Sequence, residues 1–114
     1  MRNDTLYDPQ KPLEVEEVIG FLKKKWGVCY EMRIVIRGRN IFLHIMWRYL
    51  EQKSFPDDEE KFRINISKVI EVLNRLGQSM LVRDWLVTVK GKPKLGKALS
   101  LRLKTDDRVS EFLI

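Results

Sequence analysis

Apolar residues recur at helical spacing near the start of the chain, and their pattern predicts a first helix. One face of this helix carries Val15, Val18, Ile19, Leu22 and Trp26. Pro12 suits the first turn because its missing N–H would have no intrahelical partner there. Glutamates at the start and lysines at the end complement the helix dipole, and Gly27 is a typical C-terminal stop.

An alternating pattern follows and predicts a β-hairpin. The first strand points one apolar set to the core, at Val28, Tyr30, Met32, Ile34 and Ile36. The returning strand has a matching set, at Ile41, Leu43, Ile45 and Trp47. A two-residue loop at Gly38-Arg39 or at Arg39-Asn40 keeps the two sets opposite each other, so both alternatives place Trp47 on the core face.

The second face of this hairpin is too apolar to be fully solvated. By alternation it carries Cys29, Glu31, Arg33, Val35, Phe42, His44, Met46 and Arg48. We therefore expect another segment of the chain, or a partner, to cover part of it.

A second helical pattern comes after Phe55-Pro56. Its apolar positions are Phe62, Ile66, Val69, Ile70 and Leu73. Asp57 or Asp58 can cap its start, and Gly77 marks its end. The adjacent carboxylates at residues 57–60 are better explained by this helix start than by an acid–base pair.

The last third of the chain is harder to assign. Residues 80–89 contain β-branched side chains that favour a strand, although Arg83 to Leu86 could form a helical turn. Leu99, Leu101 and Leu103 alternate with polar residues and predict a half-buried strand. An apolar tail, Glu111 to Ile114, is expected to pack down.

Together these elements predict an α+β fold with two layers. The expected order is α-β-β-α-β-β, an antiparallel sheet with two helices packed on one face. Residues 1–12 are expected to form a flexible N-terminal arm, and residues 13–114 a single α+β domain.

Composition narrows the class of protein. The 114 residues are 44% hydrophobic and 33% charged, as in ordinary soluble globular proteins. No apolar run approaches the roughly 20 residues that span a bilayer, and the N-terminus lacks the apolar core of a secretory signal, so we do not expect an integral membrane protein. Cys29 and His44 are the only residues of their kinds, which excludes an internal disulfide and a conventional zinc site; no cofactor is expected.

Positive charge is concentrated in the second half of the chain. The net charge is +6, with a balance of −1 over residues 1–60 and +7 over residues 61–114. Four lysines, Lys90, Lys92, Lys94 and Lys97, flank Pro93 and two glycines, and form a candidate anion-binding site. The spacing from Gly91 to Lys97 matches a P-loop, but Ala98 replaces the Ser or Thr that would bind magnesium, so a solvated hairpin loop is the ordinary alternative.

Two further groups of residues invite a functional interpretation. Arg48, Tyr49 and Glu51 form a candidate partner surface, because Tyr and Arg are frequent in binding hot spots. His44 and Cys29 would be the residue types for a nucleophile and its base, but neither hairpin register places them opposite each other. No catalytic residues are therefore assigned.

Three segments carry a resemblance to a known family. They are Lys25-Trp26-Gly27, the run from Met46 to Pro56, and the run from Lys92 to Ala98. With them the chain resembles, over roughly Leu13 to Ile114, a family of small proteins of unknown function that occurs in cyanobacteria and chloroplasts. The resemblance implies a location in the cyanobacterial cytoplasm or the plastid stroma and no reaction.

The expected function follows from these observations. We expect a small soluble non-enzymatic accessory or assembly protein that serves photosynthetic function through contacts with an unidentified protein partner. The alternative is a protein that binds nucleic acid or an anionic surface through its basic C-terminal half.

Overall fold

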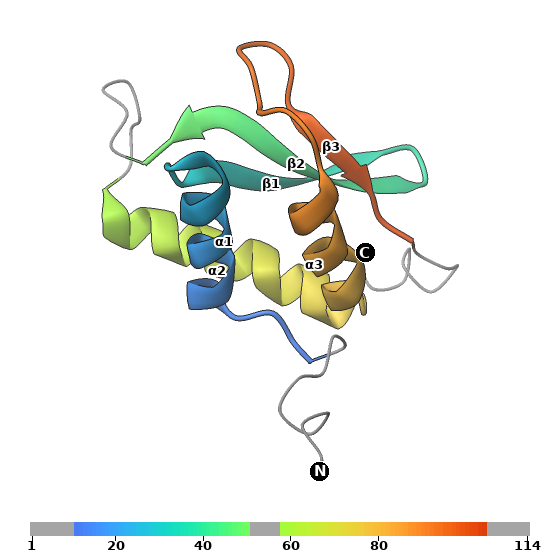
Figure 1. The fold of residues 1–114 in the computed structure, drawn as a ribbon. Coiled ribbons are helices and arrows are strands. Elements are labelled where there is room, and N and C mark those ends of the chain that lie inside the picture. The colour runs from blue at the N-terminus through green and yellow to red at the C-terminus, as the bar shows by residue number, and fades with distance from the viewer. Residues whose placement is uncertain (1–10, 51–57, 105–114) are drawn as a thin grey trace.

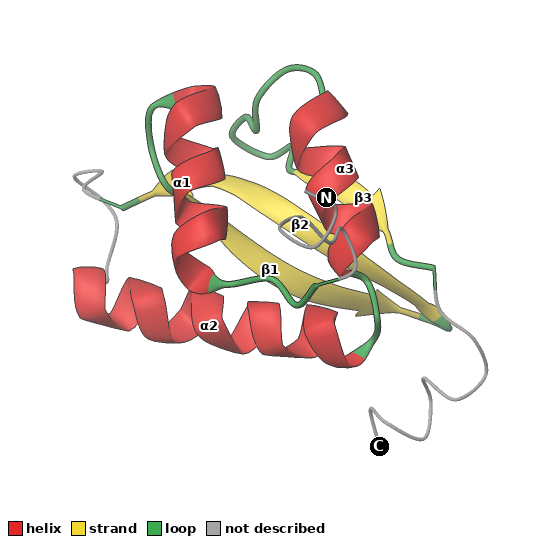
Figure 2. Cartoon of the chain, turned by 60° about the horizontal axis from the view of Figure 1, so that its bottom comes forward, coloured by secondary structure: helices red, strands yellow, loops and turns green. Residues whose placement is uncertain are grey.

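Residues 11–50 and 58–104 are described by the computed structural model and form one antiparallel sheet under three helices (Figure 1). The elements follow in the order α1 (Val15–Trp26), β1 (Tyr30–Arg37), β2 (Asn40–Tyr49), α2 (Glu59–Arg75), α3 (Ser79–Thr88) and β3 (Leu99–Arg102). The strand order is β1-β2-β3, with both pairings antiparallel and β2 in the centre. The helices lie on one face of the sheet, as Figures 1 and 2 both show. The predicted α+β class is confirmed.

The third strand of the predicted order, expected in residues 80–89, is corrected: residues 79–88 form a helix. The described part of the chain therefore holds three helices and three strands in the order α-β-β-α-α-β. Val82 and Leu86, four residues apart, are both almost fully buried, so they form the core-facing stripe of a helix. Burial of this stripe outweighs the weak strand preference of the β-branched residues, since Val87 and Thr88 lie exposed at the helix end.

Helix α2 begins and ends where the sequence predicts, and α1 ends where it predicts but begins only at Val15, with Glu14 as its cap, so that Pro12 precedes the first turn. Gly27 follows α1 in the left-handed conformation, with φ of 80°, and its N–H donates to the carbonyl of Lys23. Asp58 caps α2 by accepting a hydrogen bond from the N–H of Lys61 at 2.9 Å. A negatively charged cap at a helix N-terminus also interacts favourably with the helix dipole.

The hairpin between β1 and β2 selects one of the two predicted turns. Arg37 pairs with Asn40, so the loop is Gly38-Arg39, and Gly38 has φ of 61°. A positive φ at the first loop position suits the right-handed twist of paired strands. This register places Ile41, Leu43 and Ile45 against the helices, and all three are at most 1% exposed.

A bulge near the far end of the hairpin changes the position of Trp47. Tyr30 pairs with Tyr49 and Met32 with Ile45, so three residues of β2 lie opposite the single Glu31 of β1. Trp47 is half-buried and is not among the side chains that form or pack against the core of the described residues. Strict alternation predicts Trp47 in the core; that prediction is wrong because the irregular register lies at this residue.

Three polar side chains hold the helices together and to the sheet. Asn74 of α2 exchanges two hydrogen bonds with the backbone of Leu13, and Gln78 bonds the backbone of Lys104 just beyond β3. Arg83 of α3 reaches both carboxylate oxygens of Glu17 on α1, at 2.5 and 3.0 Å. The hydrogen bond from Arg83, and then its charge, hold the pKa of Glu17 below its ordinary value against the opposing effect of burial.

Two sequence predictions fall on residues that the structure does not describe. They are the first ten residues of the predicted N-terminal arm and the apolar tail from Glu111 to Ile114. The division into an arm and a single domain stays a prediction.

Candidate functional site

The face of the sheet that points away from the helices, called here the outer face, carries the most distinctive surface of the described residues. We define it by Arg33 and Val35 on β1, Phe42, His44 and Met46 on β2, and Ser100 and Arg102 on β3. Cross-strand pairing aligns them in two rows: Val35, Phe42 and Arg102, and next to it Arg33, His44 and Ser100. No helix within residues 11–50 and 58–104 lies over this face (Figure 1).

Two aromatic rings occupy the centre of the outer face. Phe42 and His44 are two residues apart on the central strand, so their side chains point the same way. Their ring centroids lie 6.2 Å apart at an interplanar angle of 60°. Burial, and then the positive charge of Arg37, lower the pKa of His44 below its ordinary value of 6.5, so the ring is neutral at physiological pH.

Arginines dominate the charge of the sheet. The three strands contain four arginines and one glutamate, Glu31. Glu31 accepts from Nε of Arg33 at 2.8 Å, and Arg102 donates to the side-chain oxygen of Asn40 at 2.8 Å. The carboxylate of Glu31 and the neutral amide of Asn40 orient the guanidinium groups of Arg33 and Arg102. With one glutamate against four arginines, the strands keep an excess of positive charge. The outer face therefore combines a half-buried apolar centre with a basic margin.

The structure places two residues of the predicted partner surface, Arg48 and Tyr49, on different sides of the sheet. Tyr49 packs edge-on against Tyr30 at 5.8 Å, beside the core, so its ring has a structural role. Arg48 is half-buried and, by alternation with Tyr49, belongs to the side of the outer face. Glu51 lies outside the described residues. The partner surface of Arg48, Tyr49 and Glu51 stays a prediction.

The lysine-rich segment folds as a tight turn, and we call residues 90–97 the lysine turn. Lys94 and Lys97 exchange two backbone hydrogen bonds, of 2.9 and 2.8 Å, around Leu95 and Gly96. Lys90, Lys92, Lys94 and Lys97 are all exposed. The amides of Lys94 and Lys97 are used within the turn and Pro93 has none, so these three positions offer an anion no backbone donor. Anion binding there stays a prediction.

Sequence reasoning missed one neighbour of the lysine turn. Nε1 of Trp26 donates to the carbonyl of Gly91 at 2.9 Å, and Nζ of Lys25 donates to the carbonyl of Val87 at 3.2 Å. The last turn of α1, with its three lysines, therefore lies beside the lysine turn. The end of α1 and the lysine turn are distant in sequence. Only the position of Trp26 at the end of an amphipathic helix indicated a possible contact.

The candidate catalytic pair does not form. Cys29 precedes β1 and is buried among core residues, contrary to its predicted place on the second face, because the strand begins only at Tyr30. His44 lies on the outer face, and therefore on the other side of the sheet. Among the described residues no group of three or more His, Cys, Asp or Glu side chains could hold a metal ion.

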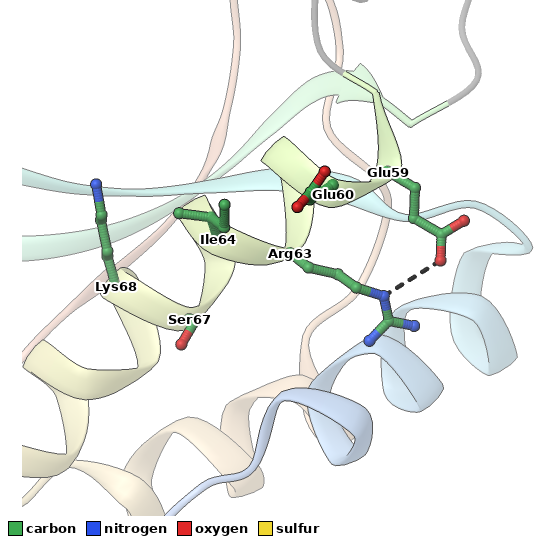
Figure 3. Close-up of a pocket in the computed structure, with 6 residues that line it drawn as sticks. All are labelled: Glu59, Glu60, Arg63, Ile64, Ser67 and Lys68. Carbon is green, nitrogen blue, oxygen red and sulfur yellow. Dashed lines mark hydrogen bonds and ion pairs between the residues drawn. The ribbon is translucent and has the colours of Figure 1, made fainter.

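Figure 3 shows an open hollow along α2, lined by Glu59, Glu60, Arg63, Ile64, Ser67 and Lys68. Its central group, Arg63, bonds Glu59 at 3.2 Å and pairs with Glu16 of α1. These hydrogen bonds raise the pKa of the guanidinium above its already high value. The pair with Glu16 joins α2 to α1 and the pair with Glu59 lies within α2, so the charged groups at the centre of the hollow are explained by the fold.

No helix of the described residues has the length and apolar character needed to cross a membrane.

Comparisons with known proteins support the fold and name no activity. Residues 16–113 match the family model described as Domain of unknown function (DUF3067). The solution structure of the Alr2454 protein from Nostoc sp. strain PCC 7120, a cyanobacterium, is similar with a TM-score of 0.78 and 35% sequence identity, over 90% of this chain and 98% of that one. No curated protein matches the chain.

Proposed function

The chain belongs to the DUF3067 family, and on that premise we propose that it is a small non-enzymatic accessory protein whose outer face binds an acidic segment of a protein partner. One observation supports this most: half-buried apolar side chains lie among arginines on a sheet face that no described helix covers. The cyanobacterial origin of the similar structure, with the family resemblance, favours action in a cyanobacterial cell or a plastid.

The composition of the outer face indicates what kind of partner would fit. Phe42 lies between Val35 on one side and Arg102 on the other, so an apolar centre has a cation directly beside it. Aromatic residues, Met and Arg are enriched in protein interfaces, and a positive margin attracts and orients a negative partner. A segment that combines one or two apolar anchors with carboxylates would satisfy both features.

The same face favours protein over nucleic acid as its ligand. Val35 and Met46 share it with the rings, and aliphatic side chains offer no π-face on which a base could stack. Phe42 and His44 are also tilted relative to each other rather than forming one flat platform. Single-stranded nucleic acid is therefore the alternative outcome of the test below.

A non-enzymatic role takes its support from the surroundings of the reactive groups. Cys29 and His44 lie on different sides of the sheet, and the carboxylates of Glu17 and Glu59 are held in ion pairs. A general base must reach its proton with a free lone pair. The pair of Glu17 with Arg83 is better explained as a link between α1 and α3, and the pair of Glu59 with Arg63 as a link within α2.

The test is affinity capture of the tagged full chain from a cyanobacterial lysate at physiological salt, with nuclease present. Three proteins are compared: the wild type, Phe42→Ala with Arg33→Glu on the outer face, and Lys68→Glu as a matched charge reversal on α2. The expected result is one stoichiometric protein that the wild type and Lys68→Glu retain and the outer-face variant loses. With the captured protein purified, the outer-face variant should bind at least tenfold more weakly, as expected for removal of an anchor and a charge.

Capture alone would not support the proposal, because any exposed surface can retain proteins from a lysate. Retention of the partner by the outer-face variant would place binding elsewhere. Loss of all partners on nuclease digestion would contradict a protein ligand and favour nucleic acid. Circular dichroism of each variant checks that a lost interaction does not reflect a lost fold.

A further inference from the structure

The tip of the lysine turn exposes an aliphatic side chain in an otherwise cationic surface. Leu95 is 76% exposed, more than any other large hydrophobic residue of the described chain. It occupies the first loop position between the paired Lys94 and Lys97, and Gly96 beside it has φ of 77°. A single exposed leucine is ordinary on a protein surface. Leu95 is unusual because it lies at the apex of a turn that is flanked by lysines.

The turn is fixed at its base. The indole N–H of Trp26 bonds the carbonyl of Gly91, the side chain of Pro93 is buried, and the reciprocal hydrogen bonds of Lys94 and Lys97 close the tip. Leu95 is therefore held away from the body of the protein rather than free to fold back onto it. A pre-ordered projection loses less conformational entropy when it meets a binding surface.

The charge along the lysine turn is entirely positive. Residues 85–98, from the last turn of α3 through the lysine turn, include Lys90, Lys92, Lys94 and Lys97 and no acidic residue. The last turn of α1 adds three lysines beside the lysine turn, and Figure 1 shows the end of α1 and the loop after α3 at the same end of the molecule. The acidic residues of α1 lie in its first turn, at the opposite end of that helix.

From these observations we propose that the lysine turn docks the protein on an anionic lipid bilayer, with Leu95 entering the headgroup region. The lysines contact lipid phosphates, and their aliphatic stems extend along the interface while the ammonium groups stay among the headgroups. An anionic bilayer fits both features of the tip. A free phosphate or a nucleic acid backbone would use the lysines and leave Leu95 in water.

This inference is independent of the proposed function, because it rests on a different surface. The outer face is centred on Phe42 and His44, whereas the lysine turn follows α3 and is anchored to α1. A protein partner on the outer face and a bilayer under the lysine turn can be tested separately with variants of each.

The test is co-sedimentation of the purified full chain with vesicles of phosphatidylcholine alone or mixed with phosphatidylglycerol. We expect binding to the mixed vesicles only, weakened by salt. Replacement of Lys92, Lys94 and Lys97 by Gln should weaken it by about fivefold per lysine, or about 100-fold together. Leu95→Ser should weaken it by about tenfold at unchanged charge, since an aliphatic group then no longer leaves water.

Two control variants come from α2: Ile64→Ser removes another half-exposed aliphatic side chain, and Lys68→Gln another exposed lysine. Both should bind vesicles like the wild type. The proposal is overturned if the mixed vesicles do not sediment the protein, or if Leu95→Ser binds them as well as the wild type. Binding of a single-stranded oligonucleotide that is insensitive to Leu95→Ser, without vesicle binding, would assign the lysines to nucleic acid instead.

Discussion

The two faces of the sheet carry apolar side chains of similar character and differ in what lies over them. On the inner face, Leu43 and Ile45 are fully buried beneath three helices. On the outer face, Phe42 and Met46, their neighbours in sequence, are half-buried with arginines around them and no described helix above them. A solvated sheet face normally alternates to polar residues. The outer face departs from this rule, and an exposed apolar patch with a polar rim is common on binding surfaces.

Truncation of neighbouring residues on the two faces should give the largest difference in the free energy of unfolding. Leu43→Ala should lower the free energy of unfolding by about 2–5 kcal/mol, because it leaves a cavity in a closed core. Phe42→Ala should lower it by about 1 kcal/mol or less, because its ring contributes little to that core. Urea denaturation of both variants measures the difference. Equal losses would mean that Phe42 belongs to a second core.

Hydrogen bonds and ion pairs between the helices stabilise the layer that covers the inner face. Arg83→Met should cost about 1–3 kcal/mol, since it removes two hydrogen bonds to Glu17 and those to the carbonyls of Lys11 and Pro12. Arg75→Met breaks an exposed pair with Glu71 and should cost less than about 0.5 kcal/mol. Thermal unfolding of the two variants at neutral pH provides the measurement, and equal effects would contradict a special role for Arg83.

The ion pair between Arg83 and Glu17 makes a contribution to stability that depends on pH in a defined direction. The pKa of Glu17 is lowered in the folded state, so its contribution is present above the ordinary value of 4.5 and is lost as pH falls through the lower folded value. The stability difference between the wild type and Arg83→Met should therefore shrink on acidification below 4.5. Glu17→Gln should abolish this part of the pH dependence, and an unchanged difference down to the acid limit would contradict the assignment.

The turn between β1 and β2 decides which side chains reach each face. Gly38→Ala should cost about 1–2 kcal/mol, because φ is 61° and an L-residue with a Cβ is strained there. No atom lies within 4 Å of the added Cβ, so the cost is conformational rather than a clash. Gly38→Asn should be better tolerated, since Asn adopts this conformation more readily. Equal stability of Gly38→Ala and the wild type, in urea denaturation, would contradict this register.

The smallest effect concerns the environment of His44 on the outer face. Burial and the charge of Arg37 lower its pKa, so its NMR titration should have a midpoint below 6.5. Arg37→Ala should move the midpoint upward, and a bound acidic partner should do the same. His44 is the only histidine, so its signals need no assignment. A midpoint above 6.5 in the free protein would contradict the described surroundings of the ring.

Elements with a clean period were predictable from the sequence. The pattern of Val18, Ile19 and Leu22, closed by Gly27, has one helical solution, and the alternation through Leu43 and Ile45 has one core face. Residues 79–88 were not decided by sequence, because a ten-residue segment rich in β-branched residues satisfies either period. Burial of Val82 and Leu86 in the common core makes the choice, and that information is not local.

The sequence predicted that the sheet has a second, partly apolar face, but it did not predict all the residues on it correctly. Alternation placed Phe42, His44 and Arg33 on a second face correctly, and the excess of apolar residues there was visible in the sequence. Trp47 and Cys29 were misplaced because one lies in an irregular register and the other before the strand begins. The contact between Trp26 and the lysine turn joins residues 65 apart, and no period or motif encodes such a distance.

Binding of the partner to the outer face, as proposed, is tested most directly by side-chain NMR on the protein with the captured partner added. Methyl signals of Val35 on β1 and Met46 on β2 report the outer face, and those of Leu43 and Ile45, both on β2, report the inner face. We predict large changes at Val35, Met46 and the ring of His44 and small ones at Leu43 and Ile45. Changes confined to the lysine turn or to α2, with Val35 and Met46 unmoved, would contradict the account.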